Sequence, residues 1–186
     1  AEPQESPAKY YLEKLVQGSK VYIFGGGHVA QEAVPTLARV NFDCIVLEDR
    51  EDFTKPELFP GARRTRLVDM EHLEEVCRDI TSDDYICVMT RGHQHDFLVE
   101  KQILRTPASY IGVIGSRKKK EAVFAKLRQE GYTDQDLARI KTPMGLDIQA
   151  ETPAEIAVSI AAEMIMERAR RNHIERPNEG GKEPCV

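Results

Sequence analysis

Hydrophobic and polar positions along the chain predict strands that alternate with helices. Short apolar runs rich in β-branched residues have the length of buried strands, and they fall at 21–24, 44–47, 64–68, 85–89 and 110–114. After the first run, apolar residues recur at helical spacing, at Val29, Ala33, Val34, Leu37 and Val40. This alternation predicts an α/β fold, a Rossmann-like doubly wound and mostly parallel sheet with helices on both faces.

Later segments carry signals for where helices begin and end. Asp69 is the predicted N-cap of a helix whose inward residues are Leu73, Val76 and Ile80. A helix over 118–130 is expected to end at Gly131, and a short one to cover 134–140. The last helix should begin with a capping box at 152–155 and end near Arg171. We expect its buried face to carry Ile156, Ile160, Ala161, Met164 and Ile165.

The domain organisation follows from these elements. We expect a polar lead-in at 1–19 with a short helical patch, a Rossmann-like domain at 20–171, and a disordered tail at 172–186, where apolar residues are few.

A glycine turn follows the first strand at once. Gly25, Gly27 and Ala30 fill the G-x-G-x-x-G/A pattern of dinucleotide-binding turns. Such glycines permit a tight turn and a close approach of phosphate, which then meets the positive end of the next helix. The predicted binding residues here are Gly25, Gly26, Gly27, His28 and Val29. The alternative is that the turn binds no ligand, or that it binds a ligand other than NAD.

Two carboxylates end the second strand. Glu48 and Asp49 follow the glycines by about 20 residues, where a ribose-binding acid is expected. Negative charge there favours NAD over NADP. Since ligands of parallel sheets bind outside the carboxyl ends of the strands, we expect the loops at 25–28, 48–52, 90–96 and 115–118 to share one rim.

The loop after the fourth strand carries Thr90, His93, His95 and Asp96. Two histidines and a carboxylate could bind a divalent metal or divide acid–base work. The alternative is that His95 faces solvent and Asp96 caps a helix. We favour Thr90, His93 and Asp96 as residues that contact a ligand, without a metal.

The loop after the fifth strand carries Gly115, Ser116 and Arg117. Backbone N–H groups, a hydroxyl and a guanidinium together form a predicted anion cradle. Lys119 and Lys120 are interpreted as a solvated helix face.

The composition and charge of the chain exclude some classes of function. A length of 186 residues with 41% hydrophobic and 31% charged residues is ordinary for a soluble globular domain. The net charge of −5 argues against nucleic acid as a partner, and no apolar run is long enough to span a membrane. The 4 cysteines include no C-x-x-C pair, and Cys44 and Cys87 lie in predicted buried strands. A reduced, cytoplasmic setting fits this usage.

Several motifs together resemble one known family. They are FGGGHVA at 24–30, EDR at 48–50, MTRGH at 89–93 with Asp96, YIGVIGSR at 110–117, PMGLDI at 143–148 and TPAEIAVS at 152–159. In this order they resemble the C-terminal Rossmann domain of the xanthine dehydrogenase accessory (XdhC/CoxI) family, over about residues 20 to 170.

The resemblance implies a maturation factor, a chaperone that acts without turnover of its own. Such a protein binds molybdenum cofactor, as molybdopterin or its cytosine dinucleotide form, and supports its sulfuration with a cysteine desulfurase. It then delivers the cofactor to an apo molybdenum hydroxylase of the xanthine dehydrogenase type. Longer members carry a cysteine-containing N-terminal domain, which these 186 residues do not include. The family resemblance leaves a homodimer open.

Two other functions stay open. A NAD(P)-dependent oxidoreductase would use the same glycine turn, although the chain leaves little room for a separate substrate domain and no Tyr-x-x-x-Lys pair is evident. A nucleotide-sensing module would bind its ligand only to alter a partner.

Overall fold

Six parallel strands form the centre of the fold in this computed structural model, which describes residues 19–174 apart from the side chains of His93, Arg117, His173 and Ile174. Neighbouring strands follow the order β3-β2-β1-β4-β5-β6, the order of a Rossmann sheet. The predicted fold class is therefore confirmed. The strands are β1 (Lys20–Phe24), β2 (Asp43–Glu48), β3 (Arg64–Leu67), β4 (Tyr85–Val88), β5 (Tyr110–Val113) and β6 (Ile140–Lys141).

Side chains of β1 alternate between two hydrophobic cores, because successive residues of a strand point to opposite faces. Val21 and Ile23 pack on one face of the sheet, and Tyr22 and Phe24 pack on the other. All four are buried. A strand that is apolar on both faces belongs in the middle of a covered sheet.

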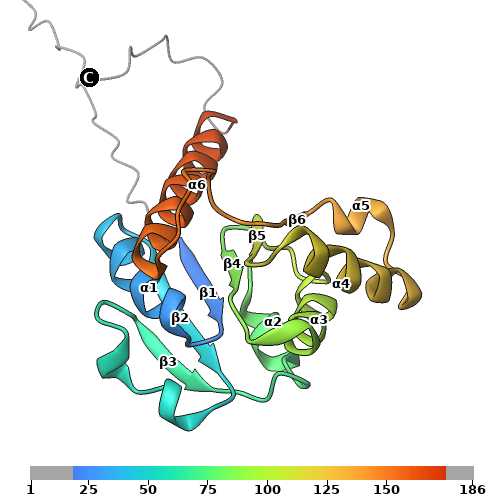
Figure 1. Cartoon of the computed structure of the whole chain (residues 1–186), viewed down its shortest axis with the longest axis horizontal. Coiled ribbons are helices and arrows are strands. Elements are labelled where there is room, and N and C mark those ends of the chain that lie inside the picture. Colours follow the sequence, from blue (N-terminus) through green and yellow to red (C-terminus); the bar gives the residue numbers. More distant parts are fainter. Residues whose placement is uncertain (1–18, 175–186) are drawn as a thin grey trace, which may run out of the picture.

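Helices cover both faces of the sheet (Figure 1). On one face lie α1 (His28–Arg39) and α6 (Pro153–Ile174), which pack against each other. On the other lie α2 (Glu74–Asp79), α3 (Gly92–Ile103) and α4 (Arg117–Gln129). The remaining elements are short: η1 (Glu51–Phe53), η2 (Pro56–Leu58) and α5 (Asp134–Leu137).

Several helix signals predicted from the sequence are confirmed. Gly131 follows α4 with a φ of +88°, a conformation that glycine adopts without strain. Thr152 and Glu155 form the expected capping box: the Glu155 N–H donates to Thr152 Oγ1 over 3.2 Å, and Glu155 Oε2 accepts the Thr152 N–H over 2.9 Å.

The prediction that Asp69 caps a helix is wrong. The helix begins later, at Glu74, with Leu73 as its N-cap. Asp69 Oδ1 instead accepts the N–H of Glu71 over 2.9 Å, closing a local turn. Gln102 of α3 supplies an acceptor at the helix start, with Oε1 lying 2.8 Å from the Leu73 nitrogen.

The predicted helix over 134–140 is too long, because its last residue belongs to the sheet. The helix α5 ends at Leu137, and Ile140 pairs with Ile111 of β5. Arg139 anchors the chain where it enters the sheet, because its guanidinium donates to the carbonyl oxygens of Leu104, Thr106 and Ala108.

The last helix also departs from its prediction. Ile165 is 39% exposed, because the buried stripe runs through Ala157, Ile160, Ala161 and Met164, one position away from it. The helix α6 continues to Ile174, so residues 172–174 are helical and do not belong to the predicted disordered tail. The predicted lead-in helix and the rest of the predicted tail lie outside the described residues.

Candidate functional site

The glycine turn between β1 and α1 is shaped by two glycines and left open by the third. Gly25 has a φ of +106°, and a Cβ there would lie 2.5 Å from the Met89 carbonyl oxygen. A Cβ on Gly26 would lie 2.5 Å from the Phe53 carbonyl oxygen. A Cβ on Gly27, the N-cap of α1, would meet no atom within 4 Å. The fold therefore requires the first two glycines, whereas Gly27 leaves free space in front of a helix N-terminus.

Glu48 supports this turn from the end of β2. Its carboxylate is 2% exposed and accepts the Gly26 N–H over 2.7 Å. Arg50 donates to both of its oxygens, from Nε over 2.9 Å and from a terminal nitrogen over 2.8 Å. Burial by itself would raise the pKa of Glu48, but the hydrogen bonds from Arg50, Asp49 and Gly26 outweigh it and lower the pKa to about 2.

Glu48 is therefore a buried carboxylate that is hydrogen-bonded to groups of the chain itself. Its oxygens already have donors from the chain, so a ribose hydroxyl would have to share them. Asp49 is more accessible, with 36% of its side chain exposed, and its Oδ2 lies 3.5 Å from His95 Nε2. Of the two predicted ribose-binding acids, Asp49 is thus the one that a ligand can reach, and its binding role stays a prediction.

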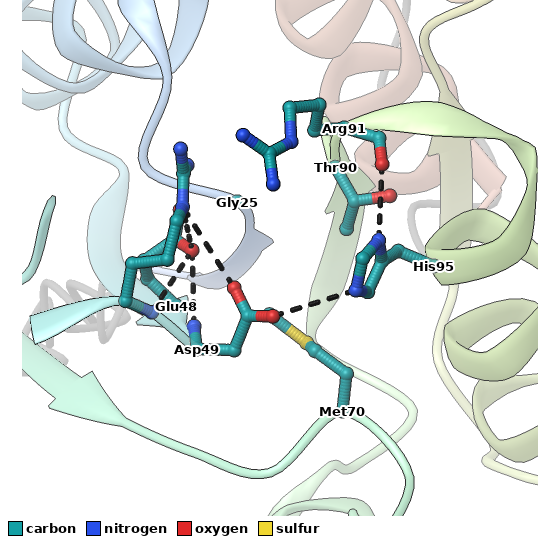
Figure 2. Close-up of a pocket in the computed structure, with 8 residues that line it drawn as sticks. Gly25, Glu48, Asp49, Met70, Thr90, Arg91 and His95 are labelled. Atoms are coloured by element: carbon teal, nitrogen blue, oxygen red, sulfur yellow. Dashed lines mark hydrogen bonds and ion pairs between the residues drawn. The ribbon is translucent and has the colours of Figure 1, made fainter.

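A crevice opens where the strand order reverses, between β1 and β4 (Figure 2). Ligands of doubly wound sheets bind at this switch point. The crevice is lined by Gly25, Glu48, Asp49, Arg50, Met70, Thr90, Arg91 and His95. Three of the four loops expected on a common rim, those after β1, β2 and β4, meet here.

Arg91 is a residue of this crevice that the candidate set from the sequence omits. Figure 2 shows its side chain extended across the opening, towards the side of Gly25 and Glu48. Arg50 is neutralised by Glu48, but within residues 19–174 no carboxylate pairs with the exposed Arg91 guanidinium. Its position two residues after a predicted strand is a usable signal, because strand ends supply the ligand contacts in this fold.

The first turn of α3 replaces the loop predicted at 90–96. The helix begins at Gly92, and His95 Nδ1 lies 3.0 Å from the Arg91 carbonyl oxygen. Asp96 turns inward and is buried, where it accepts a hydrogen bond from the Thr90 hydroxyl and pairs with the Lys119 ammonium group of α4. Lys119 is therefore not part of a solvated helix face, as the sequence suggested, because Asp96 draws it inward.

The predicted anion cradle after β5 lies beside the crevice. Gly115 lines a second pocket, between α3 and α4, that also includes Asp96, Glu100 and Lys119. Ser116 is the N-cap of α4, and its hydroxyl accepts the Lys119 N–H over 3.3 Å. The Thr90–Asp96–Lys119 contacts join the two pockets.

Two further predicted site residues, His28 and Val29, do not line either pocket. His28 is exposed at the start of α1, and Val29 is partly buried against the core. The side chains of His93 and Arg117 lie outside the described part. Among the described residues, no group of three or more His, Cys, Asp or Glu could hold a metal ion, and no helix is long and apolar enough to cross a membrane.

The strand cysteines are confirmed as buried. Burial raises the pKa of Cys44 to about 12 and that of Cys87 further still, and it raises the pKa of the half-buried Cys77 to about 11. These thiols therefore stay protonated at neutral pH and are poor nucleophiles. Cys185 lies outside the described residues.

Comparisons with known proteins agree with this architecture. The chain is 30% identical to YqeB of Escherichia coli (strain K12) over 148 residues, which is 78% of this chain and 27% of that protein. It is 26% identical over 160 residues to a Bacillus subtilis (strain 168) protein that is named as a probable xanthine dehydrogenase component, covering 86% of this chain and 46% of the relative. The chain thus spans less than half the length of these relatives.

A solved structure and a family model complete the comparison. The crystal structure of a xanthine dehydrogenase from Bacillus halodurans superposes with a TM-score of 0.73 at 27% identity, covering 86% of this chain and 45% of that one. The family model described as the XdhC Rossmann domain matches residues 21–164. The chain therefore belongs to the XdhC Rossmann domain family.

Proposed function

We propose that this chain binds molybdenum cofactor in the crevice between β1 and β4, and that it serves a molybdenum hydroxylase of the xanthine dehydrogenase type as an accessory factor. The client enzyme uses the cofactor for redox chemistry, so this chain has only to bind, orient and release it. Two relatives are named for xanthine dehydrogenase, which supports a role in that system.

The single observation that carries the proposal is the open space at Gly27, the N-cap of α1. A phosphate in that space would meet the N–H groups of the first turn of α1, which have no acceptor within the helix. The Arg91 guanidinium extends across the crevice towards the side of Gly25 and Glu48, and a guanidinium suits bidentate contact with phosphate. Molybdopterin carries a phosphate, and its dinucleotide form carries a pyrophosphate, so both fit this donor set.

The test is anaerobic titration calorimetry of the reduced protein with molybdenum cofactor, beside NAD⁺ and NADH. Gly27→Val should abolish cofactor binding, because the side chain fills the space kept free for the phosphate, whereas folding should be unaffected. Glu32→Val, an exposed change one turn further along α1, is the matched control and should bind normally. Arg91→Ala should weaken binding about tenfold or more, with the exposed Arg39→Ala as its control.

Two results would contradict the proposal. Unchanged affinity in Gly27→Val would remove the glycine turn from the site. Binding of NADH without binding of molybdenum cofactor would favour the oxidoreductase, in which the accessible Asp49 would meet the ribose.

A further inference from the structure

The second pocket, between α3 and α4, contains a buried carboxyl group that lacks a hydrogen-bond partner. Glu100 lies one helical turn after Asp96 and is 2% exposed. Its Oε2 is fully buried, and no described residue donates to it. A buried polar atom without a partner is costly, and native proteins keep few of them unless the atom has a use.

The described neighbours of Glu100 leave this oxygen without a hydrogen-bond partner. The charged groups that line the pocket with it are Asp96 on its own helix and Lys119 and Lys120 of α4. The rest of the described lining comes from β5, α4 and the segments after β5 and β6, and it brings no titratable side chain. The Lys119 ammonium pairs with Asp96. Among the described residues, Glu100 Oε2 therefore has no hydrogen-bond partner.

The other walls of the pocket are largely apolar. They come from Val113 and Ile114 at the end of β5 and from Val123 and Phe124 of α4. Apolar walls around one fixed polar group are typical of a site for a flat organic ring. A metal ion is a poorer fit, because it would need additional oxygen ligands and would be repelled by the Lys119 ammonium.

We propose that this pocket binds the 2-amino-4-oxopyrimidine edge shared by pterins and guanine, with Glu100 as the acceptor of its two adjacent N–H donors. A carboxylate accepts two parallel N–H groups in a fork arrangement. This inference rests on the proposed function, because it assigns the ring of the ligand to this pocket and its phosphate to the glycine turn. Thr90, which lines the crevice and donates to Asp96, connects the two.

Entry of a ring requires a local change. With the side chains as they lie, the pocket has room for about one water molecule. Lys120 is a partly exposed member of its lining and has a long, flexible stem, so it can move without disturbing the ion pair of Lys119 with Asp96.

Proton release gives the proposal a second readout. Burial, reinforced by the nearby Asp96, raises the pKa of Glu100 to about 8, so the free protein holds a proton there at pH 7. Two N–H donors require the ionised carboxylate, and binding at pH 7 should therefore release a proton. Affinity should rise with pH and level off above about pH 8.

The experiment is calorimetry with two ligand pairs that differ at C2 of the ring. GDP carries a 2-amino group that IDP lacks, and pterin carries an amino group where lumazine carries an oxo group. Wild-type protein should bind the amino member of at least one pair about tenfold or more tightly. Repeating the titration at pH 7 in buffers of different ionisation enthalpy should show proton release.

Glu100→Gln should lose both the preference and the proton release, while the exposed Glu121→Gln on α4 should keep both. Glutamine is neutral, as the protonated Glu100 is, so the variant should fold; circular dichroism checks this. A preference for pterin alone, or for GDP alone, identifies which source of the shared edge the pocket takes.

Equal binding of both members of each pair, or no binding of any, overturns the inference. Its failure is distinguishable from failure of the proposed function. If molybdenum cofactor binds in a Gly27-dependent way but the ligand pairs are not discriminated, only the ring assignment is wrong. If the pairs are discriminated through Glu100 but molybdenum cofactor does not bind, the pocket stands and the cofactor proposal is wrong.

Discussion

Glu48 accepts the backbone N–H of Gly26 over 2.7 Å, so the acid that ends β2 holds the glycine turn that follows β1. The contact is reinforced by Arg50, whose guanidinium grips both carboxylate oxygens. An acid at this position of a Rossmann fold usually belongs to the ligand site. In this chain its first task is to build the turn on which that site depends.

Glu48→Gln should destabilise the protein by about 2–3 kcal/mol, because the amide keeps the shape of the side chain but loses its charge-assisted hydrogen bonds and leaves Arg50 without a counter-ion. Urea unfolding at pH 7 measures the change. The exposed Glu57→Gln is the control and should fall within about 0.5 kcal/mol of wild type. A loss in Glu48→Gln no larger than in this control would show that the carboxylate network contributes no net stability.

The same carboxylate should make the protein acid-sensitive. Its pKa falls from 4.5 to about 2 on folding, so its stabilisation is complete above pH 4.5 and is lost as the pH falls towards 2. The loss attributable to this group is about 3 kcal/mol. Unfolding free energies measured between pH 6 and pH 2 should show it, and the Glu48→Gln variant should have a flatter profile over that range.

Glu100 should have the opposite effect on stability. Its pKa rises from 4.5 to about 8 on folding, so the folded protein holds a proton that the unfolded chain releases, and stability falls as the pH rises from 4.5 to 8. Glu100→Gln avoids this penalty, which is at most about 4–5 kcal/mol. Thermal unfolding should find the variant more stable than wild type at pH 8 and similar to it at pH 5. If the variant and wild type were equally stable at pH 8 as well as at pH 5, the pKa of Glu100 would have its ordinary value.

Gly25→Ala should destabilise the domain by about 2–4 kcal/mol, because the residue holds a φ of +106° and its new Cβ would collide with the Met89 carbonyl oxygen. Gly27→Ala, two residues away, should change the unfolding free energy by less than about 1 kcal/mol, since its Cβ enters open space. Chemical denaturation of the pair separates the glycine that shapes the turn from the one that leaves room beside it. Equal losses in the two variants would contradict this division.

The buried hydrogen bond between Tyr110 and Glu163 lies on the face of the sheet that α1 and α6 cover. It should contribute a similar amount to the free energy of unfolding. The Tyr110 hydroxyl donates to Glu163 Oε1 over 2.5 Å, and the same oxygen accepts the Gly145 N–H over 3.2 Å. Tyr110→Phe should therefore cost about 1–3 kcal/mol, because Glu163 stays buried with one donor fewer. A double-mutant cycle with Glu163→Gln measures the coupling, and a coupling near zero would show that the two side chains act independently.

The sheet and the glycine turn could be predicted because their signals are local. A continuous apolar run such as 21–24 predicts a strand buried on both faces, and the order of strands and helices implies the winding. The strand β6 could not be predicted in this way, because it has only two residues and depends on pairing between Ile140 and Ile111. The start of α2 likewise depends on Gln102, which comes from another helix.

The residues of the candidate site also divide into those that a local pattern predicts and those that depend on neighbours in space. Strand-end residues such as Asp49 and Thr90 were expected at the rim, since the topology brings strand ends together. That no carboxylate within residues 19–174 pairs with Arg91, and that Glu48 bonds to groups of the chain itself, depends on which residues lie nearby in space. Glu100 is one turn from Asp96 in any helical reading, but its burial follows from the approach of α4, which no local pattern encodes.

The central position of β1 has a consequence during synthesis of the chain. β1 emerges from the ribosome before any other strand of the described part, yet its neighbour β4 begins only at Tyr85. At a synthesis rate of 5–20 residues per second, roughly 3–12 s pass before β4 can pair with the edge of β1. The apolar face of α1 waits longer still, for α6. The segment that carries the glycine turn is thus translated early and enclosed last, and it is the stretch that a nascent-chain chaperone would most need to shield.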